Sequence, residues 1–234
     1  MKALNILECI NSGDNVRAKY NVDFKSNDVY LLYSKHEKKI LDDWHFYFNF
    51  LPPKLKEEVL RYKLSTDRNN SLMGKLMLYI GYYILTGRRI LLNDLLKGTF
   101  GKPYVKNSRI NFNISHSGNG VICGFSINSL GVDIEKPSSI DIECFEDVFT
   151  YEEFEIIKKE GEEKFFNFWT QKEAISKEIG KGLILPFRNI ELGVNKAKIN
   201  NELWHIRGER MDGFYYSIAS RVPIKNVKIL NIYF

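Results

Sequence analysis

The sequence predicts an α+β fold of two similar α/β halves with a functional site between them. Hydrophobic residues make up 44% of the 234 positions, which is enough apolar material for a sizeable core. A strand, a short helix and a long helix begin near positions 29, 54 and 67, and a second such set begins near 131, 151 and 162. These offsets of 102, 97 and 95 residues indicate an internal duplication. No glycine- or proline-rich linker separates the halves, residues 1–130 and 131–234, so we expect them to pack together.

Three elements are predicted at the start of the first half. Residues 29–33 (VYLLY) favour a strand because they are β-branched, aromatic and apolar. Residues 54–63 have helical periodicity and follow two prolines. Asp67 is expected to cap a longer helix that runs toward Leu85, with Gly87 just past its end. Glycines then mark a loop before the next strands.

The remaining elements continue across the boundary between the halves. Residues 111–114 and 121–127 favour two short strands, joined by a turn over residues 115–120. Thr150, with Glu153 three residues later, predicts a capping box at a helix start. The helix that Thr150 caps is expected to end at residue 159, and a second helix is expected at 162–179. Strands are expected at 131–135, 215–219 and 227–233.

Net charge, the longest apolar run and the cysteines limit the class of protein and its location. The net charge of +5 suits an anionic ligand, an acidic partner or a nucleic acid, and does not choose among them. The longest apolar run, residues 76–85, is half the ~20 residues of a membrane span, so we expect a buried helix and no membrane partner. The N-terminus lacks the features of a signal peptide, and Cys9, Cys123 and Cys144 form no metal-ligand pattern. We therefore expect reduced cysteines in a cytoplasmic protein.

Two carboxylates stand two residues apart on the predicted strand at 131–135. Side chains on a strand alternate between its faces, so Asp133 and Glu135 point the same way while Val132 and Ile134 point into the core. Two carboxylates on a rigid strand suit a hard divalent cation, Mg²⁺ above all. The polar outer face of an edge strand explains the same pattern, and this pair taken alone favours that explanation.

One face of the predicted helix at 162–179 carries an unusual mixture of side chains. Trp169, Glu173 and Lys177 recur every four residues and therefore share that face. A large aromatic beside a carboxylate and an ammonium is odd for a core stripe and for a solvated one, although a surface Glu–Lys pair is an equal alternative. Residues 180–183 (GKGL) follow, where the glycines either let the backbone approach an anion or simply end the helix.

A serine and a histidine stand in residues 112–117 (FNISHS), at the predicted turn. The hydroxyl of Ser115 and the imidazole of His116 are suited to bind phosphate, and a turn without a ligand is the alternative. A Ser–His catalytic dyad is not expected. Neighbours along the chain cannot easily place the hydroxyl against the adjacent ring in attack geometry.

Taken together, the runs FNISHS, GVDIE and FWTQKEAxxKxxGKGL resemble the Sfp-type phosphopantetheinyl transferase superfamily in order and spacing. The resemblance covers at least residues 101–183. It implies that family's fold, with two halves related by a pseudo-two-fold axis. It also implies transfer of the 4'-phosphopantetheine group of coenzyme A to a serine of an acyl or peptidyl carrier protein, with release of adenosine 3',5'-bisphosphate.

The resemblance implies a role for each matching residue. Asp133, Glu135 and Glu173 would bind Mg²⁺, or Mn²⁺ in its place, together with the pyrophosphate of coenzyme A. Glu173 would take the proton from the carrier serine, and Lys177 would stabilise the departing nucleotide. The residues expected to bind coenzyme A are Arg68, Ser71, Lys75, Lys102, Ser115, His116 and Lys177.

The two halves are expected to have different roles. Residues 1–130 would supply the nucleotide-binding surface, and 131–234 the metal ligands and the catalytic helix. A shift of 97 residues aligns Leu76 with Glu173, so the first half lacks the catalytic carboxylate and one site is expected. The chain departs from the family at residues 67–71, because Asn70 stands where the family usually has arginine, and Arg68 is assigned the phosphate contact instead.

The expected partner is a folded carrier protein, in fatty-acid, polyketide or nonribosomal peptide synthesis. Such carriers are typically acidic, which suits the net charge, and the pseudo-dimeric length predicts a monomer. Apolar residues between Glu143 and Phe154 are candidates for its docking surface and, with greater weight, for the core: Phe145, Val148 and Phe149.

A metal-dependent nuclease or phosphodiesterase is the main alternative function. In one large nuclease group a lysine follows the carboxylate by two on the same strand, whereas Lys136 follows Glu135 by one and would face away. A nucleotide- or RNA-binding module is disfavoured because the basic residues are scattered, and no nucleic-acid partner is expected. A family member that binds coenzyme A without chemistry is disfavoured by the intact carboxylates.

Overall fold

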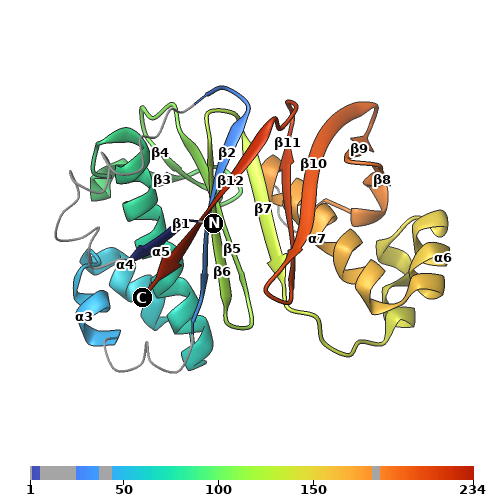
Figure 1. The fold of residues 1–234 in the computed structure, drawn as a ribbon, viewed down its shortest axis with the longest axis horizontal. Coiled ribbons are helices and arrows are strands. Elements are labelled where there is room, and N and C mark those ends of the chain that lie inside the picture. Colours follow the sequence, from blue (N-terminus) through green and yellow to red (C-terminus); the bar gives the residue numbers. More distant parts are fainter. Residues whose placement is uncertain (1, 6–24, 37–43, 181–184) are drawn as a thin grey trace.

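The computed structural model of the chain describes residues 2–5, 25–36, 44–180 and 185–234. Two five-stranded sheets lie face to face with helices on their outer sides, so the layers run helix, sheet, sheet, helix (Figure 1). The inner faces of the sheets enclose an apolar cluster in which Leu31, Val132 and Ile218 have no exposed surface. The predicted α+β fold, with two sheet-containing halves packed together, is confirmed.

The first sheet has the strand order β1-β12-β2-β6-β5. Its strands are β1 (Lys2–Asn5), β2 (Asp28–Lys35), β5 (Asn111–Ser117), β6 (Gly120–Ser126) and β12 (Asn226–Tyr233). The other elements of this half are α3 (Trp44–Asn49), α4 (Pro53–Leu60), α5 (Ser65–Thr86), a 3-10 turn (Leu92–Asp94), β3 (Leu95–Lys97) and β4 (Pro103–Val105). The apolar run of β2 is explained by burial on both faces, since Leu32 contacts the core under α5 and Leu31 packs between the sheets.

The second sheet has the strand order β7-β11-β10-β9-β8. Its strands are β7 (Leu130–Glu135), β8 (Glu191–Gly193), β9 (Lys196–Ile199), β10 (Glu202–Met211) and β11 (Phe214–Ser220). The helices of this half are α6 (Tyr151–Glu160), α7 (Glu162–Ile179) and the 3-10 helices Ile142–Val148 and Phe187–Asn189. α6 begins with the predicted capping box, in which Thr150 and Glu153 exchange hydrogen bonds.

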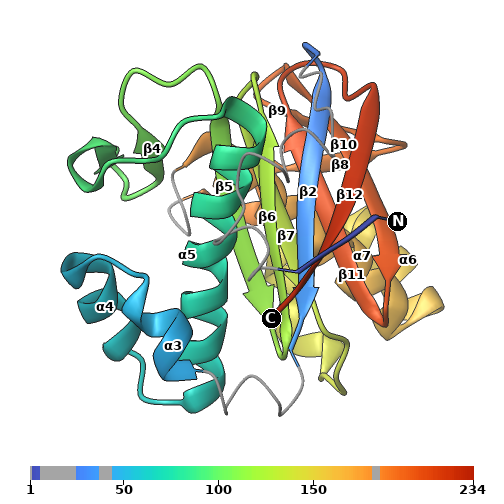
Figure 2. The ribbon, with the colours of Figure 1, turned by 60° about the vertical axis from the view of Figure 1, so that its left-hand side comes forward.

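α5 lies on the outer face of the first sheet, as Figure 2 shows. Gly81 allows the close approach, because a Cβ atom there would lie 2.5 Å from the ring of Phe125. The helix begins at Ser65 rather than after a cap at Asp67, so that predicted cap is wrong. Asp67 instead lies in the first turn, where its negative charge favours the positive end of the helix dipole. Gly87 ends α5 in the left-handed conformation, as expected.

The expected division into residues 1–130 and 131–234 differs from the sheets in one respect. β7 begins at Leu130, but β12 comes from the far end of the chain and pairs in parallel with β1 and β2 of the first sheet. A strand buried on both faces, such as β2, needs a partner along each edge, and β12 supplies one. The separate roles of the two halves stay a prediction.

Cysteine and membrane expectations concern smaller parts of the chain. Cys123 is buried and Cys144 is exposed, and both are free thiols; Cys9 lies outside the described residues. Among the described residues, none of the helices combines the length and the apolar character that a membrane crossing requires.

Candidate active site

A backbone contact at Gly131 holds α7 against β7. A Cβ atom at this position would lie 1.9 Å from the carbonyl oxygen of Ala174, so only glycine lets the strand and the helix come so close. Glu173 and Lys177 flank this contact on α7. The close approach therefore brings a carboxylate and an ammonium of the helix beside the carboxylates of β7.

The residues predicted to form a turn at 115–120 are largely strand. β5 continues to Ser117, and only Gly118 and Asn119 form the turn before β6. β5 pairs with β6 along its whole length, so pairing overrides the local turn composition and the predicted turn is wrong in its extent. Because side chains alternate along the strand, Ser115 and Ser117 both point toward β7.

Asp133 is the most buried of the predicted metal ligands, with 2% of its surface exposed. Its Oδ1 accepts hydrogen bonds from Ser115 Oγ at 2.8 Å and Lys177 Nζ at 2.5 Å. Its Oδ2 is buried and has no hydrogen-bond partner in the part of the chain that the structure describes. Burial raises the pKa of Asp133, although Lys177 and Ser115 oppose the rise. The carboxylate is therefore not the polar outer face of an edge strand, and one of its oxygens is left for a further ligand.

Glu135 and Glu173 lie within electrostatic range of Asp133, and we call these three carboxylates the acidic group. Burial, followed by the charge of Asp133, raises the pKa of Glu135 to about 7. Burial also raises the pKa of Glu173, and Asp133 adds to the rise while Lys177 opposes it. Within the described part of the chain, however, no three His, Cys, Asp or Glu side chains are arranged to hold a metal ion. The Lys177 ammonium forms an ion pair with Asp133. Lys177 therefore takes part in this pair rather than in the alternative surface pair with Glu173.

Three of the residues expected to bind coenzyme A lie near one another in the first half: Ser71, Lys75 and His116. The Lys75 ammonium donates to Ser71 Oγ at 3.1 Å and lies 3.4 Å from Glu58 Oε2. Burial lowers the pKa of Lys75, although Glu58 opposes this. Burial also lowers the pKa of His116, and the positive charges of Lys177 and Lys75 lower it further. Ser71, Lys75 and His116 thus lie near one another, and His116 is also within electrostatic range of Lys177.

Arg68 and Asn70 are both engaged in contacts of the first half. The Arg68 Nε donates to the Tyr62 carbonyl at 2.6 Å, which braces the turn between α4 and α5. The Asn70 amide donates to the Gly118 carbonyl at 2.9 Å and accepts from His36 Nε2 at 2.8 Å. Asn70 therefore fixes the turn between β5 and β6, and the phosphate contact assigned to Arg68 stays a prediction.

Lys102 joins the β3–β4 hairpin to the second half. Its ammonium donates to the carbonyl oxygens of Leu130 at 3.0 Å and Glu178 at 2.8 Å. These bonds satisfy a carbonyl in the last turn of α7, where a positive charge is favourable. Gly180 ends α7 in the left-handed conformation, as the simpler alternative for this glycine expects; residues 181–183 lie outside the described residues.

The apolar residues considered for docking are mainly core. Phe149 is 1% exposed, and the partly buried Phe145 packs against Phe165 and Trp169. Val148 is also only partly exposed and contacts the same cluster. This arrangement confirms the preferred assignment of these side chains to the core.

Sequence reasoning missed a buried charge next to the catalytic helix face. Lys172 has no exposed surface and forms an ion pair with Glu153 at 2.7 Å. Its ammonium also donates to the carbonyl oxygens of Phe187 and Ile190, at 2.9 and 2.6 Å. No sequence signal indicates this burial, because Glu153 and the two carbonyl groups come from other elements.

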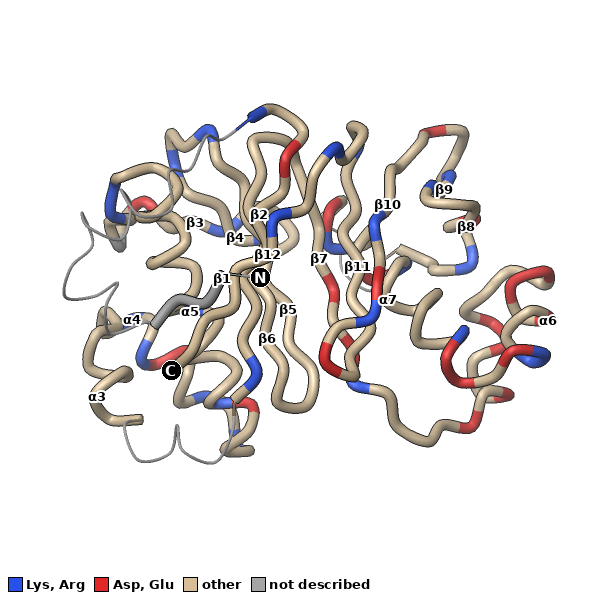
Figure 3. Tube along the Cα trace, in the orientation of Figure 1, with Lys and Arg blue, Asp and Glu red and all other residues tan. Residues whose placement is uncertain are grey.

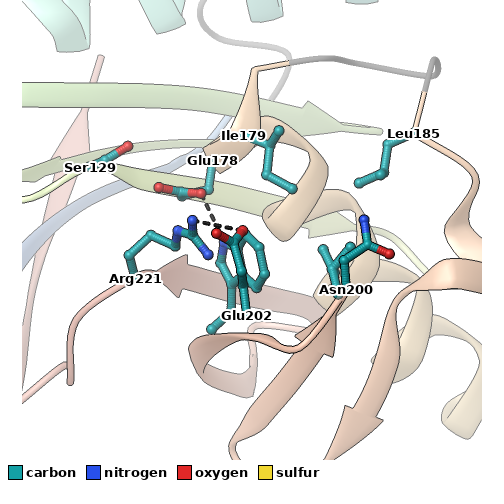
Figure 4. A pocket seen from close by; sticks show the side chains of 9 residues that line it. Ser129, Glu178, Ile179, Leu185, Asn200, Glu202 and Arg221 are labelled. Carbon is teal, nitrogen blue, oxygen red and sulfur yellow. Dashed lines mark hydrogen bonds and ion pairs between the residues drawn. The ribbon is translucent and has the colours of Figure 1, made fainter.

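A separate cavity of ≈ 390 Å³ lies near the end of α7 (Figure 4). Glu178, Trp204 and Arg221 are prominent in its wall. Trp204 Nε1 donates to Glu178, and Arg221 stacks on the Trp204 ring and pairs with Glu202. None of the predicted site residues lines this cavity, and its charged groups are already paired with each other, so we place the chemistry at the acidic group instead.

Comparison with known proteins gives concordant matches over both halves. A family model described as "4'-phosphopantetheinyl transferase superfamily" matches residues 129–215, and one described as "4'-phosphopantetheinyl transferase, N-terminal" matches residues 38–126. The 4'-phosphopantetheinyl transferase gsp of Aneurinibacillus migulanus is 34% identical over 161 residues, covering 64% of this chain and 67% of the relative. The 4'-phosphopantetheinyl transferase Sfp of Bacillus subtilis strain 168 is 29% identical over 157 residues, covering 64% and 69%. The L-aminoadipate-semialdehyde dehydrogenase-phosphopantetheinyl transferase of Candida glabrata is 28% identical over 196 residues, covering 76% and 75%.

Proposed function

This chain belongs to the 4'-phosphopantetheinyl transferase superfamily, and on that basis we propose that its acidic group, Asp133, Glu135 and Glu173, binds Mg²⁺ with the pyrophosphate of coenzyme A. The chain is a transferase that moves the 4'-phosphopantetheine group of coenzyme A to a serine of a carrier protein. The alternative of a nuclease or phosphodiesterase is not supported. The release of adenosine 3',5'-bisphosphate follows from the bond that is broken.

The observation that carries the metal proposal is the buried Oδ2 of Asp133, which has no hydrogen-bond partner among the described residues. A buried carboxylate oxygen without a hydrogen bond is costly, and a divalent cation would relieve that cost. The donors are oxygens, which Mg²⁺ prefers, and Mn²⁺ accepts the same set. Burial raises the pKa of Glu135 and of Glu173, and the nearby charge of Asp133 raises both pKa values further. A divalent cation would reduce this repulsion between the carboxylates. The chemistry of the three carboxylates therefore suits a divalent cation, and to hold one they would have to converge while Lys177 moves away from Asp133.

The roles of the protein groups follow from their positions. When bound, the cation would neutralise charge on the phosphate under attack. Glu173 would accept the proton of the carrier serine, since a raised pKa brings a carboxylate closer to the operating pH of a general base. Lys177 would stabilise the departing phosphate, for which its ammonium must leave Asp133.

The positive group of the first half would bind the phosphates of coenzyme A. Lys75, Ser71 and His116 offer an ammonium, a hydroxyl and an imidazole, and His116 lies within electrostatic range of Lys177. The backbone-bonded Lys102, together with Ser115, Lys177 and Arg68, would complete the contacts with coenzyme A. Phosphate binding by these side chains would compensate the negative charges that meet at the site.

Charge is unequally divided between the halves, which suits an acidic carrier. Residues 1–130 contain 19 Lys and Arg against 11 Asp and Glu, whereas residues 131–234 contain 15 against 18. Figure 3 shows this contrast, with acidic positions concentrated around α6. An acidic carrier would be attracted by the first half and repelled by α6. Because both halves belong to one chain, a monomer would suffice for the site.

The reaction is tested by intact-mass analysis of carrier proteins. An apo acyl carrier protein and an apo peptidyl carrier domain are each incubated with the protein, coenzyme A and Mg²⁺. We expect a gain of one phosphopantetheinyl group that is lost with EDTA and with Glu173→Gln. Glu163→Gln is the matched control, because Glu163 is an exposed glutamate of the same helix. A mass gain that survives EDTA would contradict the metal proposal.

A further inference from the structure

Three polar side chains of β5 reach β7 across the junction of the two sheets. Asn113 Oδ1 accepts a hydrogen bond from the Val132 backbone N–H at 2.8 Å. Ser115 Oγ donates to Asp133 Oδ1 at 2.8 Å, and Ser117 Oγ donates to Glu135 Oε2 at 2.6 Å. We call this set of contacts the seam, made by Asn113, Ser115 and Ser117 on β5 and Val132, Asp133 and Glu135 on β7.

The seam occupies the place where two sheets end. β5 is the last strand of the first sheet and β7 is the last strand of the second, within the part of the chain that the structure describes. Strands at such edges normally leave backbone groups unpaired or pair them with another strand. Here side chains at every second position of β5 supply the bonds instead. The seam therefore fixes how far β7, and the carboxylates on it, can move relative to the first half.

Ser117 makes the contact that bears most directly on a carboxylate without itself being expected to bind substrate. Its hydroxyl donates to Glu135 and accepts a hydrogen bond from the Lys136 backbone N–H at 3.1 Å. These two bonds use both the donor and an acceptor position of the hydroxyl, so its orientation is fixed. A hydroxyl held by backbone on one side fixes the carboxylate on its other side.

We propose that Ser117 is a positioning residue that holds the Glu135 carboxylate toward the cation site shared with Asp133. This inference rests on the proposed metal binding by the acidic group. Ser115 holds Asp133 in the same way, but it also contacts Lys177 and is expected to bind phosphate, so its loss would change several functions at once. Ser117 separates positioning from substrate binding, because within the seam its hydroxyl bonds to the Glu135 carboxylate and to the Lys136 backbone N–H and to no other described residue.

The decisive variants are Ser117→Ala, which removes the donor, and Ser117→Thr, which keeps it. Ser126→Ala is the matched control, because Ser126 is a buried serine on the paired strand β6 whose hydroxyl donates to the backbone carbonyl of Asp28. Each protein is titrated with Mn²⁺ in the presence of coenzyme A and without carrier, and free Mn²⁺ is followed by electron paramagnetic resonance. Thermal unfolding of the same proteins in EDTA measures their stability without the metal.

We expect Ser117→Ala to weaken Mn²⁺ binding about tenfold, as is usual when the group orienting a metal ligand is lost. Ser117→Thr should restore most of the affinity, and Ser126→Ala should bind like the unmodified protein. In turnover assays the Mg²⁺ concentration for half-maximal rate should rise more than kcat falls. Unchanged Mn²⁺ affinity in Ser117→Ala, or equal weakening in Ser126→Ala, would overturn the positioning role. If the unmodified protein bound no Mn²⁺, the metal proposal itself would fail, and the inference with it.

Discussion

The contact between β7 and α7 predicts a large effect of Gly131→Ala. The added Cβ would lie 1.9 Å from the Ala174 carbonyl oxygen and 2.4 Å from the Glu178 backbone nitrogen. Ordinary contacts of a Cβ atom begin at about 3.4 Å, so the helix and the strand must separate by on the order of 1 Å. Both clashes involve backbone, which cannot rotate away, so we expect a loss of about 3 kcal/mol of unfolding free energy, at the upper end for overpacking.

The same displacement would reach the site. Glu173 and Lys177 move with α7, whereas Asp133 moves with β7, and a misplacement of 1 Å costs roughly 10²-fold in turnover. Urea unfolding would measure the stability, and intact-mass analysis of a carrier would measure turnover at a temperature where the variant remains folded. Gly98→Ala is the control, since a Cβ there would have its nearest contact at 3.6 Å. A folded Gly131→Ala protein with turnover within threefold of the original would refute the reasoning.

Three further perturbations test separate parts of the structure. Lys172→Met leaves the buried Glu153 carboxylate without its ion-pair partner, so we expect urea unfolding to show a loss of about 3–5 kcal/mol of unfolding free energy. A loss under 1 kcal/mol would contradict a stabilising role of the buried pair. Lys177→Met should lower kcat by roughly 10²-fold in the mass assay, and a loss under tenfold would argue against a transition-state role. His116 has a lowered folded pKa, so the unfolded chain binds the proton more readily and stability falls as pH drops below the ordinary value of 6.5. Between pH 7.5 and 5.5, His116→Asn should therefore lose less stability than the unmodified protein, and an equal loss would contradict the shift.

Helix boundaries can be predicted from the sequence where the local signals agree with the burial of the helix. α7 spans Glu162–Ile179 as predicted, because a helical pattern there is followed by Gly180 in the left-handed conformation. The α6 capping box was likewise readable, since both of its partners are three residues apart. Such features depend on neighbours in the chain and need no knowledge of the rest of the fold.

The sequence was insufficient where a distant partner decides the structure. Ser115 and Ser117 precede three residues that favour turns, yet they are strand because β5 pairs with β6 and faces β7. Lys172 looks like a solvated lysine until Glu153, from another helix, and two loop carbonyls are brought against it. The composition of β12 does not show which sheet it joins, because its apolar residues would suit a place in either sheet.

Asn70 shows how the same limit applies to a residue of the site. Members of the family usually have at this position an arginine that contacts the nucleotide. The resemblance therefore assigns the phosphate contact to Arg68 instead of Asn70. In the structure the Asn70 amide bonds to His36 and to the Gly118 carbonyl, so it holds the turn that follows Ser117. The end of β5 is thereby fixed from α5 as well as from β7. The short amide side chain has both an acceptor, which receives the His36 hydrogen bond, and a donor for the Gly118 carbonyl. The departure from the family at position 70 therefore goes together with support for the end of β5, the strand whose serines contact the carboxylates of β7.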